Sequence, residues 1–204
     1  MNGSNRAFPT QAVIFAGGLG TRMREETEFR PKPMVSIGGR PILWHIMKSY
    51  SKFGVTSFVI LTGYKSEVIK EYFANFRVLS SDFTITVGNR ESIVFHGDVD
   101  EMNWEVTVLD TGAETLTGGR LLQAKDFLAP GPFFCTYGDG VSDLDLSRLV
   151  VSHHDSSRLA TVTVSNPPSR FGLLDFREDG SIKSFREKPV VDDWVNIGYF
   201  VFDH

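Results

Sequence analysis

The sequence has little cysteine, no excess of basic residues and no long apolar run. Its single cysteine, Cys135, cannot form an internal disulfide and lies within the apolar run PFFCTYG. We therefore expect a buried core thiol rather than a zinc ligand or a nucleophile. The net charge of −4 provides no global basic field for nucleic acids or membranes. No apolar run reaches the roughly 20 residues that span a bilayer, which predicts a soluble cytoplasmic protein.

The chain does contain enough apolar residues for one globular domain. Of its 204 residues, 41% are hydrophobic and 12% are aromatic, which is sufficient for a sizeable core. The first ten residues, MNGSNRAFPT, are polar and predict a flexible N-terminal arm over residues 1–10 rather than a signal peptide. Residues 11–204 then form the domain, because no repeat, low-complexity tract or linker divides them.

Five short apolar runs predict a sheet with helices between its strands. The runs are AVIFAGG, SFVILTGY, VTVLD, PFFCTYGDG and LATVTVSN. They are nearly continuous in apolar residues, which is typical of parallel strands covered on both faces. We predict one helix from Pro41 to Gly54, a second with Ser66 as N-cap and a third with Asp145 as N-cap. The alternation predicts an α/β fold: a Rossmann-like, doubly wound, mostly parallel sheet.

Two segments interrupt this alternation. Residues 77–110 include FTITVGNRESIVFHGDV, which predicts an inserted β region of irregular or antiparallel structure. Residues 171–188 predict a β-hairpin, because two runs are joined through the turn dipeptide Asp179-Gly180.

The histidines do not form a recognisable catalytic or metal-binding pattern. We expect His45, which follows Trp44, to be a packed core histidine. His153 and His154 precede Asp155 at what we take to be a polar helix end, so we expect no zinc there. No Ser-His-Asp or Cys-His arrangement indicates covalent catalysis.

The glycine-rich loop GGLGTR follows the first predicted strand and is the first candidate site. It is not a dinucleotide fingerprint, because the third glycine would fall on Met23, and no G-K-[ST] sequence makes it a Walker A loop. Glycines let backbone N–H groups approach a ligand, although a tight strand-to-helix turn would also use them. The cations Arg22 and Lys32 favour phosphate binding, and Pro31 and Pro33 are expected to hold Lys32 in a rigid extended segment.

Three further patterns are weaker alone. Asp139 in YGDG follows an apolar strand and could bind Mg²⁺ together with substrate phosphates, or could serve only as a turn residue. Glu187 and Lys188 follow the predicted hairpin and could hold sugar hydroxyls and a second anionic group, or could be an ordinary surface pair. Arg120 follows paired glycines at a predicted helix start, which indicates either an anion site or a simple helix start.

The ordered set of motifs resembles a known family. GGLGTRMREETEFRPKPM, YGDG and EKP occur in the order and spacing of the sugar-1-phosphate nucleotidyltransferases. The segments SIGGRPILWHIMKSY, VTVLDTGAETLTGGRL and NPPSRFGLLDF are similar to the glucose-1-phosphate cytidylyltransferases among them. The resemblance extends from about Gln11 to the end of the sequence.

This resemblance implies transfer of a cytidylyl group from CTP to α-D-glucose 1-phosphate, with release of pyrophosphate and with Mg²⁺ as cofactor. It also implies a homo-oligomer and a place in nucleotide-sugar synthesis for surface polysaccharide such as O antigen. The implied catalytic residues are Arg22, Lys32 and the metal ligand Asp139. The implied substrate-binding residues are Gly17, Gly18, Gly20, Thr21, Thr115, Arg120, Gly172, Glu187, Lys188 and Asn196.

In one respect the sequence departs from the family pattern. The family supplies a second magnesium-binding aspartate from a segment that would follow residue 204, and Asp203 is a poor substitute. We therefore expect residues 11–204 to be a nucleotidyltransferase domain lacking its C-terminal segment. The same chemistry with dTTP or UTP, and a nucleotide-binding module without turnover, are the alternatives.

Overall fold

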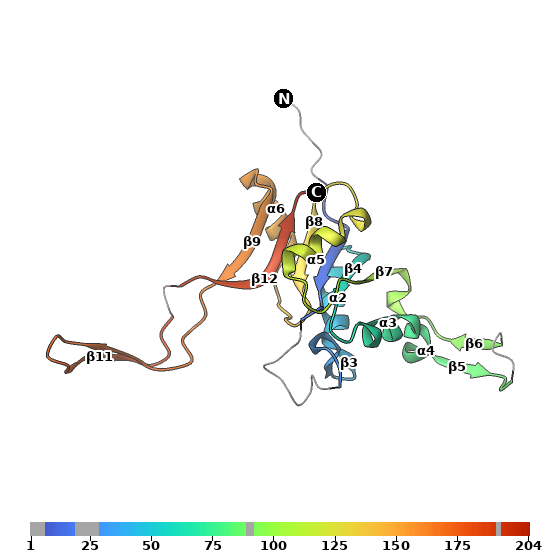
Figure 1. Cartoon of the computed structure of the whole chain (residues 1–204), viewed down its shortest axis with the longest axis horizontal. Coiled ribbons are helices and arrows are strands. Elements are labelled where there is room, and N and C mark those ends of the chain that lie inside the picture. Colours follow the sequence, from blue (N-terminus) through green and yellow to red (C-terminus); the bar gives the residue numbers. More distant parts are fainter. Residues whose placement is uncertain (1–6, 19–28, 89–91, 191–192) are drawn as a thin grey trace, which may run out of the picture.

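A computed structural model describes residues 7–18, 29–88, 92–190 and 193–204, and its centre is one six-stranded sheet (Figure 1). The strand order is β7-β4-β1-β8-β12-β9. Strand β1 pairs in parallel with β4 and β8, β4 pairs in parallel with β7, and β12 is antiparallel to both β8 and β9. The predicted mostly parallel sheet is therefore confirmed. Its strands are β1 (Gln11–Phe15), β4 (Ser57–Thr62), β7 (Glu105–Asp110), β8 (Phe133–Tyr137), β9 (Ala160–Ser165) and β12 (Val195–Phe202).

Helices and small hairpins make up the rest of the described regular structure. The α-helices are α2 (Ile42–Ser51), α3 (Ser66–Ala74), α4 (Phe76–Ser80), α5 (Thr117–Gln123) and α6 (Leu146–Ser156). The 3-10 helices are η2 (Lys32–Met34), η3 (Asp100–Asn103) and η4 (Lys125–Phe127). Three antiparallel pairs lie outside the main sheet: β2 (Ser36–Ile37) with β3 (Arg40–Pro41), β5 (Asp82–Ile85) with β6 (Ile93–His96), and β10 (Leu173–Phe176) with β11 (Ile182–Arg186).

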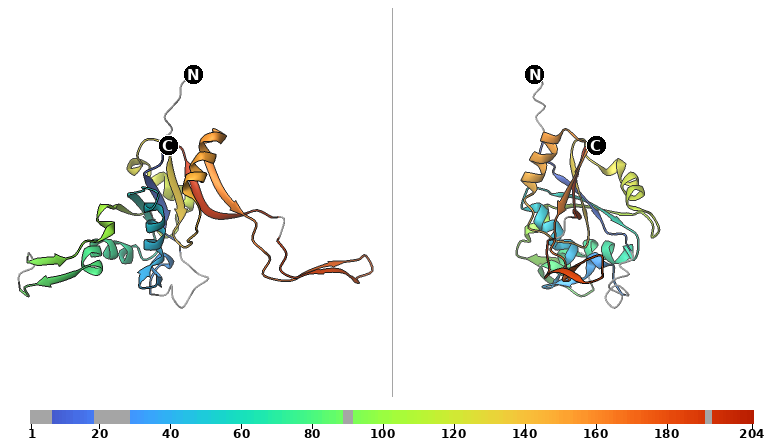
Figure 2. Two further views of the ribbon diagram at one scale, coloured as in Figure 1. Left: turned by 180° about the vertical axis from the view of Figure 1, so that it is seen from behind. Right: turned by 90° about the vertical axis from the view of Figure 1, so that its left-hand side faces the viewer.

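The sheet has a hydrophobic core on each of its two faces. Successive strand side chains point to opposite faces, so Ala12 and Ile14 of β1 pack with the apolar faces of α2 and α6. Val13 and Cys135 pack on the other face, with Ala124 next to α5. The right-hand view of Figure 2 shows the sheet edge-on with helices on both sides. Cys135 is a buried free thiol, as predicted, and burial raises the pKa of that thiol.

Two hairpins extend away from the sheet on opposite sides (Figure 1). The β5–β6 pair confirms antiparallel structure within the inserted region predicted over residues 77–110. The prediction is wrong at both ends of that region, because residues 77–80 belong to α4 and residues 105–110 form β7, a parallel strand of the main sheet. The β10–β11 pair confirms the predicted hairpin, and Gly180 in its turn has φ 82°, which favours glycine. Several large apolar side chains of the second hairpin are exposed, among them Phe176 and Phe185.

The strand and helix-cap predictions needed two corrections. Coverage on both faces is wrong for β9, whose side chains alternate between exposed and half-buried, because β9 is an edge strand. The second helix begins at Ser66, but its N-cap is Lys65 in the left-handed region (φ 52°). The backbone N–H of Ser66 instead donates to the Gly63 carbonyl in a tight turn after β4. Asp145 caps α6 as predicted, accepting from the backbone N–H groups of Ser147 and Arg148.

The histidine predictions were also wrong in part. His45 is only half-buried, because the face of α2 that packs into the core carries Leu43, Ile46 and Tyr50. The Nε2 atom of His45 lies 2.8 Å from the Ile37 carbonyl. His153 lies in the last turn of α6, as expected, but it is buried and only 2% exposed. Its ring lies between Thr161 and Asp203, with Nδ1 2.8 Å from the threonine hydroxyl and Nε2 3.3 Å from the aspartate.

Candidate active site

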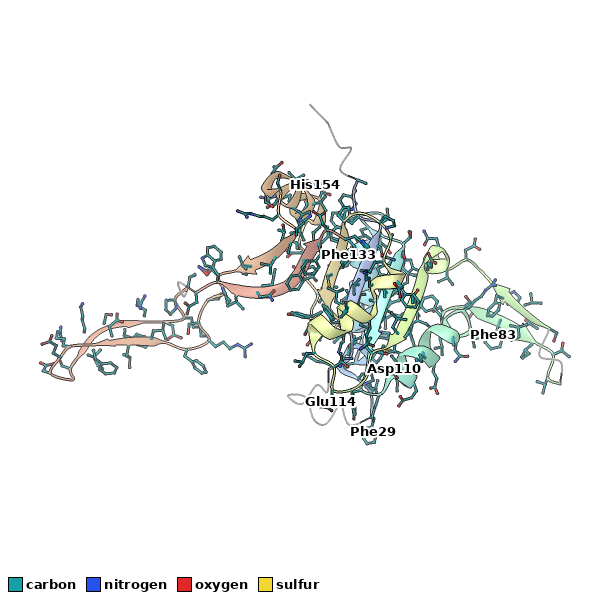
Figure 3. The ribbon with its side chains drawn as sticks, turned by 45° about the horizontal axis from the view of Figure 1, so that its top comes forward. Phe29, Phe83, Asp110, Glu114, Phe133 and His154 are labelled. Carbon is teal, nitrogen blue, oxygen red and sulfur yellow. The ribbon has the colours of Figure 1, made fainter. Side chains whose placement is uncertain are left out.

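One cavity lies at the carboxyl ends of the parallel strands. It has a volume of about 560 Å³, within the size range of small-molecule sites. Figure 3 shows Glu114, one of its lining residues, at the end of the sheet opposite to Phe133 and His154. The cavity is lined by Phe15, Ala16, Gly17, Gly18, Lys32, Pro33, Ala113, Glu114, Thr115, Leu116, Thr117, Arg120, Tyr137 and Asp139. The structure thus brings six predicted site residues around one cavity: Gly17, Gly18, Lys32, Thr115, Arg120 and Asp139.

An ion pair between Lys32 and Asp139 joins two sides of the cavity. Lys32 Nζ donates to Asp139 Oδ2 over 2.6 Å, and the two side chains are 28% and 42% exposed. Lys32 begins the 3-10 helix η2 instead of lying in an extended segment, although Pro31 before it is extended. The contact spans 107 residues of sequence, so the ion pair itself could not be predicted from local motifs.

Close backbone packing holds Asp139 at this place. The N–H of Gly138 donates to the Phe15 carbonyl over 2.9 Å, which fixes the end of β8 beside the end of β1. A Cβ atom on Gly138 would lie 2.8 Å from that same carbonyl oxygen and 3.1 Å from Pro33 Cγ. Glycine is therefore required before Asp139 so that the carboxylate can approach the segment that contains Lys32.

Arg120 is buried beneath the cavity and connects three chain segments. Arg120 is only 5% exposed. It lies in the middle of α5, not at a helix start as predicted. Nη1 donates to the Thr62 carbonyl (2.7 Å) and to Thr111 Oγ1 (2.6 Å). Nη2 donates to the carbonyls of Gly17 and Ala113, each over 3.1 Å. The guanidinium therefore holds the glycine loop against the ends of β4 and β7.

The same arginine places positive charge at the cavity wall. Desolvation by burial lowers the pKa of Arg120, and the nearby Asp110 carboxylate opposes that shift. No carboxylate within the described segments is hydrogen-bonded to this guanidinium; Asp110 instead lies 3.9 Å from Lys70 Nζ. A buried charge in this environment attracts anions more strongly than an exposed one, because less water screens it. Together with Lys32, Arg120 makes the cavity suitable for a polyphosphate.

The two described glycines of the GGLGTR loop differ in what surrounds them. A Cβ atom on Gly17 would lie 2.1 Å from Arg120 Nη1 and 2.4 Å from Arg120 Cζ, so this glycine admits the arginine. A Cβ atom on Gly18 would meet nothing within 4 Å, because Gly18 is exposed at the cavity. Three other predicted site residues of the loop, Gly20, Thr21 and Arg22, lie outside the described residues.

The predicted sugar-binding residues do not line the cavity. Gly172, Glu187 and Lys188 flank the β10–β11 hairpin, which extends away from the sheet (Figure 1). Glu187 and Lys188 are exposed and face each other at 4.0 Å. A Cβ atom on Gly172 would lie 2.5 Å from Phe185 Cε2, so this glycine permits the hairpin's own packing. Asn196, at the start of β12, accepts a hydrogen bond from the N–H of Gly198 over 2.8 Å.

Sequence reasoning missed Tyr137, whose half-exposed ring lines the cavity. Its ring centroid lies 6.1 Å from that of Phe15 and 5.7 Å from that of Phe200. Gly198 leaves space for the ring, since a Cβ atom there would lie 2.5 Å from Tyr137 Cδ2. The signal was available, because Tyr137 directly precedes Gly-Asp-Gly at a strand end.

No group of three or more His, Cys, Asp or Glu side chains in the described residues could hold a metal ion. The described cavity lining has two carboxylates, Glu114 and the predicted ligand Asp139. Asp203 cannot join it, because Phe202 pairs with Phe133 at the opposite end of β8 from Tyr137. Within the described part of the chain, no helix has both the length and the apolar character needed to cross a membrane.

Comparisons with known proteins agree with this geometry. A family model described as nucleotidyl transferase matches residues 11–204. The chain belongs to the nucleotidyl transferase family. This nucleotidyl transferase is 49% identical over 195 residues to the glucose-1-phosphate cytidylyltransferase of Salmonella typhimurium, covering 95% of this chain and 75% of that protein.

Solved structures support the fold of this nucleotidyl transferase. The inositol-1-phosphate CTP transferase from T. maritima matches with a TM-score of 0.63 at 18% identity, covering 97% of this chain and 72% of that one. HddC from Yersinia pseudotuberculosis, complexed with GMP-PN, matches with a TM-score of 0.62 at 24% identity, covering 95% of this chain and 76% of that one. At these identities the likeness shows the fold alone.

Proposed function

We propose that this protein transfers a cytidylyl group from CTP to α-D-glucose 1-phosphate, which yields CDP-glucose and pyrophosphate. The identity of 49% to a glucose-1-phosphate cytidylyltransferase supports the substrates. The observation that carries the proposal is the cavity at the carboxyl ends of the parallel strands, where open α/β sheets bind ligands and where Lys32 and Arg120 both reach the lining. A phosphate oxygen of the sugar phosphate attacks the α-phosphorus of CTP, and the bond to pyrophosphate breaks.

Catalysis of this step depends mainly on positioning and on neutralising phosphate charge. Lys32 is the cavity's half-exposed cation and is suited to contact the α-phosphate. The exposed backbone of Gly18 can approach the phosphates without a side chain in the way. Arg120 contributes charge and, because its terminal nitrogens donate to protein acceptors, positions the loop that contains Gly17. Thr115 is a half-buried lining residue suited to contact the nucleotide.

Asp139 is the residue suited to hold Mg²⁺. Its carboxylate already accepts one cation, the Lys32 ammonium, at 2.6 Å, so a cation fits there. Magnesium is commonly bound by one or two carboxylates together with substrate phosphates, which suits a cavity without a larger cluster of ligating side chains among the described residues. When bound, the ion would supply charge neutralisation for the phosphates.

The remaining parts of the proposal rest on the family resemblance. Gly172, Glu187, Lys188 and Asn196 would face the sugar phosphate, which requires the hairpin to approach a cavity that it does not line here. A homo-oligomer, cytoplasmic location and a role in surface-polysaccharide synthesis are proposed on the same ground. Arg22, Gly20 and Thr21 are proposed to contact the triphosphate.

Two alternative functions can be distinguished from this proposal by assay. The same reaction with dTTP or UTP would use the same cavity with another base. A nucleotide-binding module without turnover is favoured because the hairpin residues do not line the cavity and because the described residues contain no group of three metal-ligating side chains.

The test is pyrophosphate release by the 204-residue chain with glucose 1-phosphate, Mg²⁺ and each of CTP, UTP, dTTP, ATP and GTP in turn. Release with CTP above all others supports the proposal. Release with dTTP or UTP instead transfers the assignment to that nucleotide. Binding of CTP by calorimetry without any pyrophosphate release, in a sample that unfolds cooperatively, selects the binding module.

A further inference from the structure

The ion pair in the cavity joins two groups that have separate tasks in the proposed function. Lys32 would contact the nucleotide phosphates, and Asp139 would hold the divalent cation. In the structure the ammonium of one donates to the carboxylate of the other over 2.6 Å, a short and charge-assisted contact. While this hydrogen bond exists, the ammonium and the carboxylate are paired with each other and not with a ligand.

The backbone around both residues favours this pairing. Pro31 and Pro33 fix the main chain on either side of Lys32, and Pro33 is buried. The bond from the N–H of Gly138 to the Phe15 carbonyl fixes the main chain before Asp139. In the segments that the structure describes, Lys32 and Asp139 have no other ion-pair partner. The two charges are therefore held within reach by their own segments and need no ligand to meet.

We propose that Lys32 is the resident counter-ion of Asp139 in the nucleotide-free protein and is displaced when a divalent cation binds there. The inference rests on the proposed function, which assigns the two residues to phosphate and metal. Displacement then couples two events: occupation of the carboxylate by the cation releases the ammonium for the phosphates. The protein without nucleotide consequently binds the cation weakly, because the ion pair must first be broken.

The first test measures Mn²⁺ binding to the nucleotide-free chain by electron paramagnetic resonance, with Mn²⁺ as the probe. Lys32→Gln removes the counter-ion and should bind Mn²⁺ about three- to tenfold more tightly than the wild type, as expected for a partly exposed, charge-assisted pair. Arg30→Gln is the matched control, because it removes an exposed positive charge two residues away that does not line the cavity. Its affinity should stay within about twofold.

Three results would overturn the inference. Equal affinity of Lys32→Gln and the wild type means that no pair has to be broken. An equal gain in Arg30→Gln means that general charge repulsion, rather than displacement, governs the affinity. Binding that persists unchanged in Asp139→Asn, or that is absent from all of these proteins, means that this carboxylate is not where the cation binds.

The second test follows Lys32 itself. An amine that donates to a carboxylate is shielded from acylation, so Mg²⁺ should raise the acetylation rate of Lys32, read by peptide mass spectrometry, severalfold without nucleotide. In Asp139→Asn the rate should be high and independent of Mg²⁺, while Lys52, exposed beyond α2, serves as internal reference. A rate in the wild type that Mg²⁺ does not change contradicts the inference. Neither test requires turnover, so failure of the proposed reaction and failure of displacement are distinguishable.

Discussion

The contact between Gly17 and Arg120 gives a sharp prediction about stability. In Gly17→Ala the new Cβ would lie 2.1 Å from Nη1 of a guanidinium that is held by four hydrogen bonds. The arginine must move, which combines overpacking at roughly 1–3 kcal/mol with the loss of hydrogen bonds at about 1 kcal/mol each. The Thr62 carbonyl would still accept a hydrogen bond from the backbone N–H of Thr111, so the movement of the arginine would not leave that carbonyl without a donor. We expect the free energy of unfolding to fall by about 3 kcal/mol.

The neighbouring glycine is the matched control. A Cβ atom at Gly18 meets nothing within 4 Å, so Gly18→Ala should leave the free energy of unfolding within about 1 kcal/mol of the wild type. For a chain of this size, a loss of about 3 kcal/mol lowers Tm by roughly 6–12 °C. Urea unfolding followed by circular dichroism, together with thermal scans, measures both variants.

A double-mutant cycle tests the cause. If the penalty comes from the arginine, Gly17→Ala should cost less than about 1 kcal/mol in an Arg120→Ala background, giving a coupling energy of about 2 kcal/mol. Equal destabilisation by the two glycine variants, or an unchanged penalty at Gly17 after the arginine is removed, would refute this account of the loop.

Three further predictions concern single side chains. Asp139→Asn should abolish Mg²⁺-dependent pyrophosphate release while Tm stays within about 3 °C, since the side chain is partly exposed; unchanged activity at limiting Mg²⁺ contradicts the metal assignment. Lys32→Ala should lower kcat about 100-fold or more, and an effect on KM alone would restrict Lys32 to binding. Burial raises the pKa of the Cys135 thiol, so above about pH 8.5 the unfolded chain loses that proton while the folded chain keeps it. The contribution of this thiol to the free energy of unfolding is therefore complete below about pH 8.5 and declines above it. Between about pH 8.5 and 10, the Tm of Cys135→Ala should fall less steeply than that of the wild type. Parallel Tm-against-pH curves for the two proteins would contradict this.

Much of the fold could be predicted because local patterns determine it. The continuous apolar runs identified β1, β4 and β8, whose side chains are buried on both faces by distant helices. The Asp179-Gly180 turn likewise identified the β10–β11 hairpin, since Gly180 has the positive φ that such turns need. Coverage of β9 could not be predicted, because its edge position depends on the strand order.

The candidate site was predictable in its chemistry but not in its contacts. The motifs supplied Lys32, Asp139 and Arg120, yet nothing near Arg120 in sequence indicates that its guanidinium turns inward to Gly17, 103 residues away. The glycine was interpreted as a phosphate-loop residue, whereas the structure gives it a second reason, space for the arginine. The burial of His153 is unpredictable for the same reason, because its partners are distant in sequence: Thr161 lies in β9 and Asp203 directly follows β12.

The central claim is cytidylyl transfer in the cavity that Lys32 and Asp139 share. Its most direct test is incubation of the chain with CTP labelled at the α-phosphate, glucose 1-phosphate and Mg²⁺, followed by separation of the nucleotides. The account predicts that the label appears in CDP-glucose with the wild type and stays in CTP with Asp139→Asn. Label that stays in CTP with a folded wild-type sample, or that reaches CDP-glucose equally with both proteins, would contradict it.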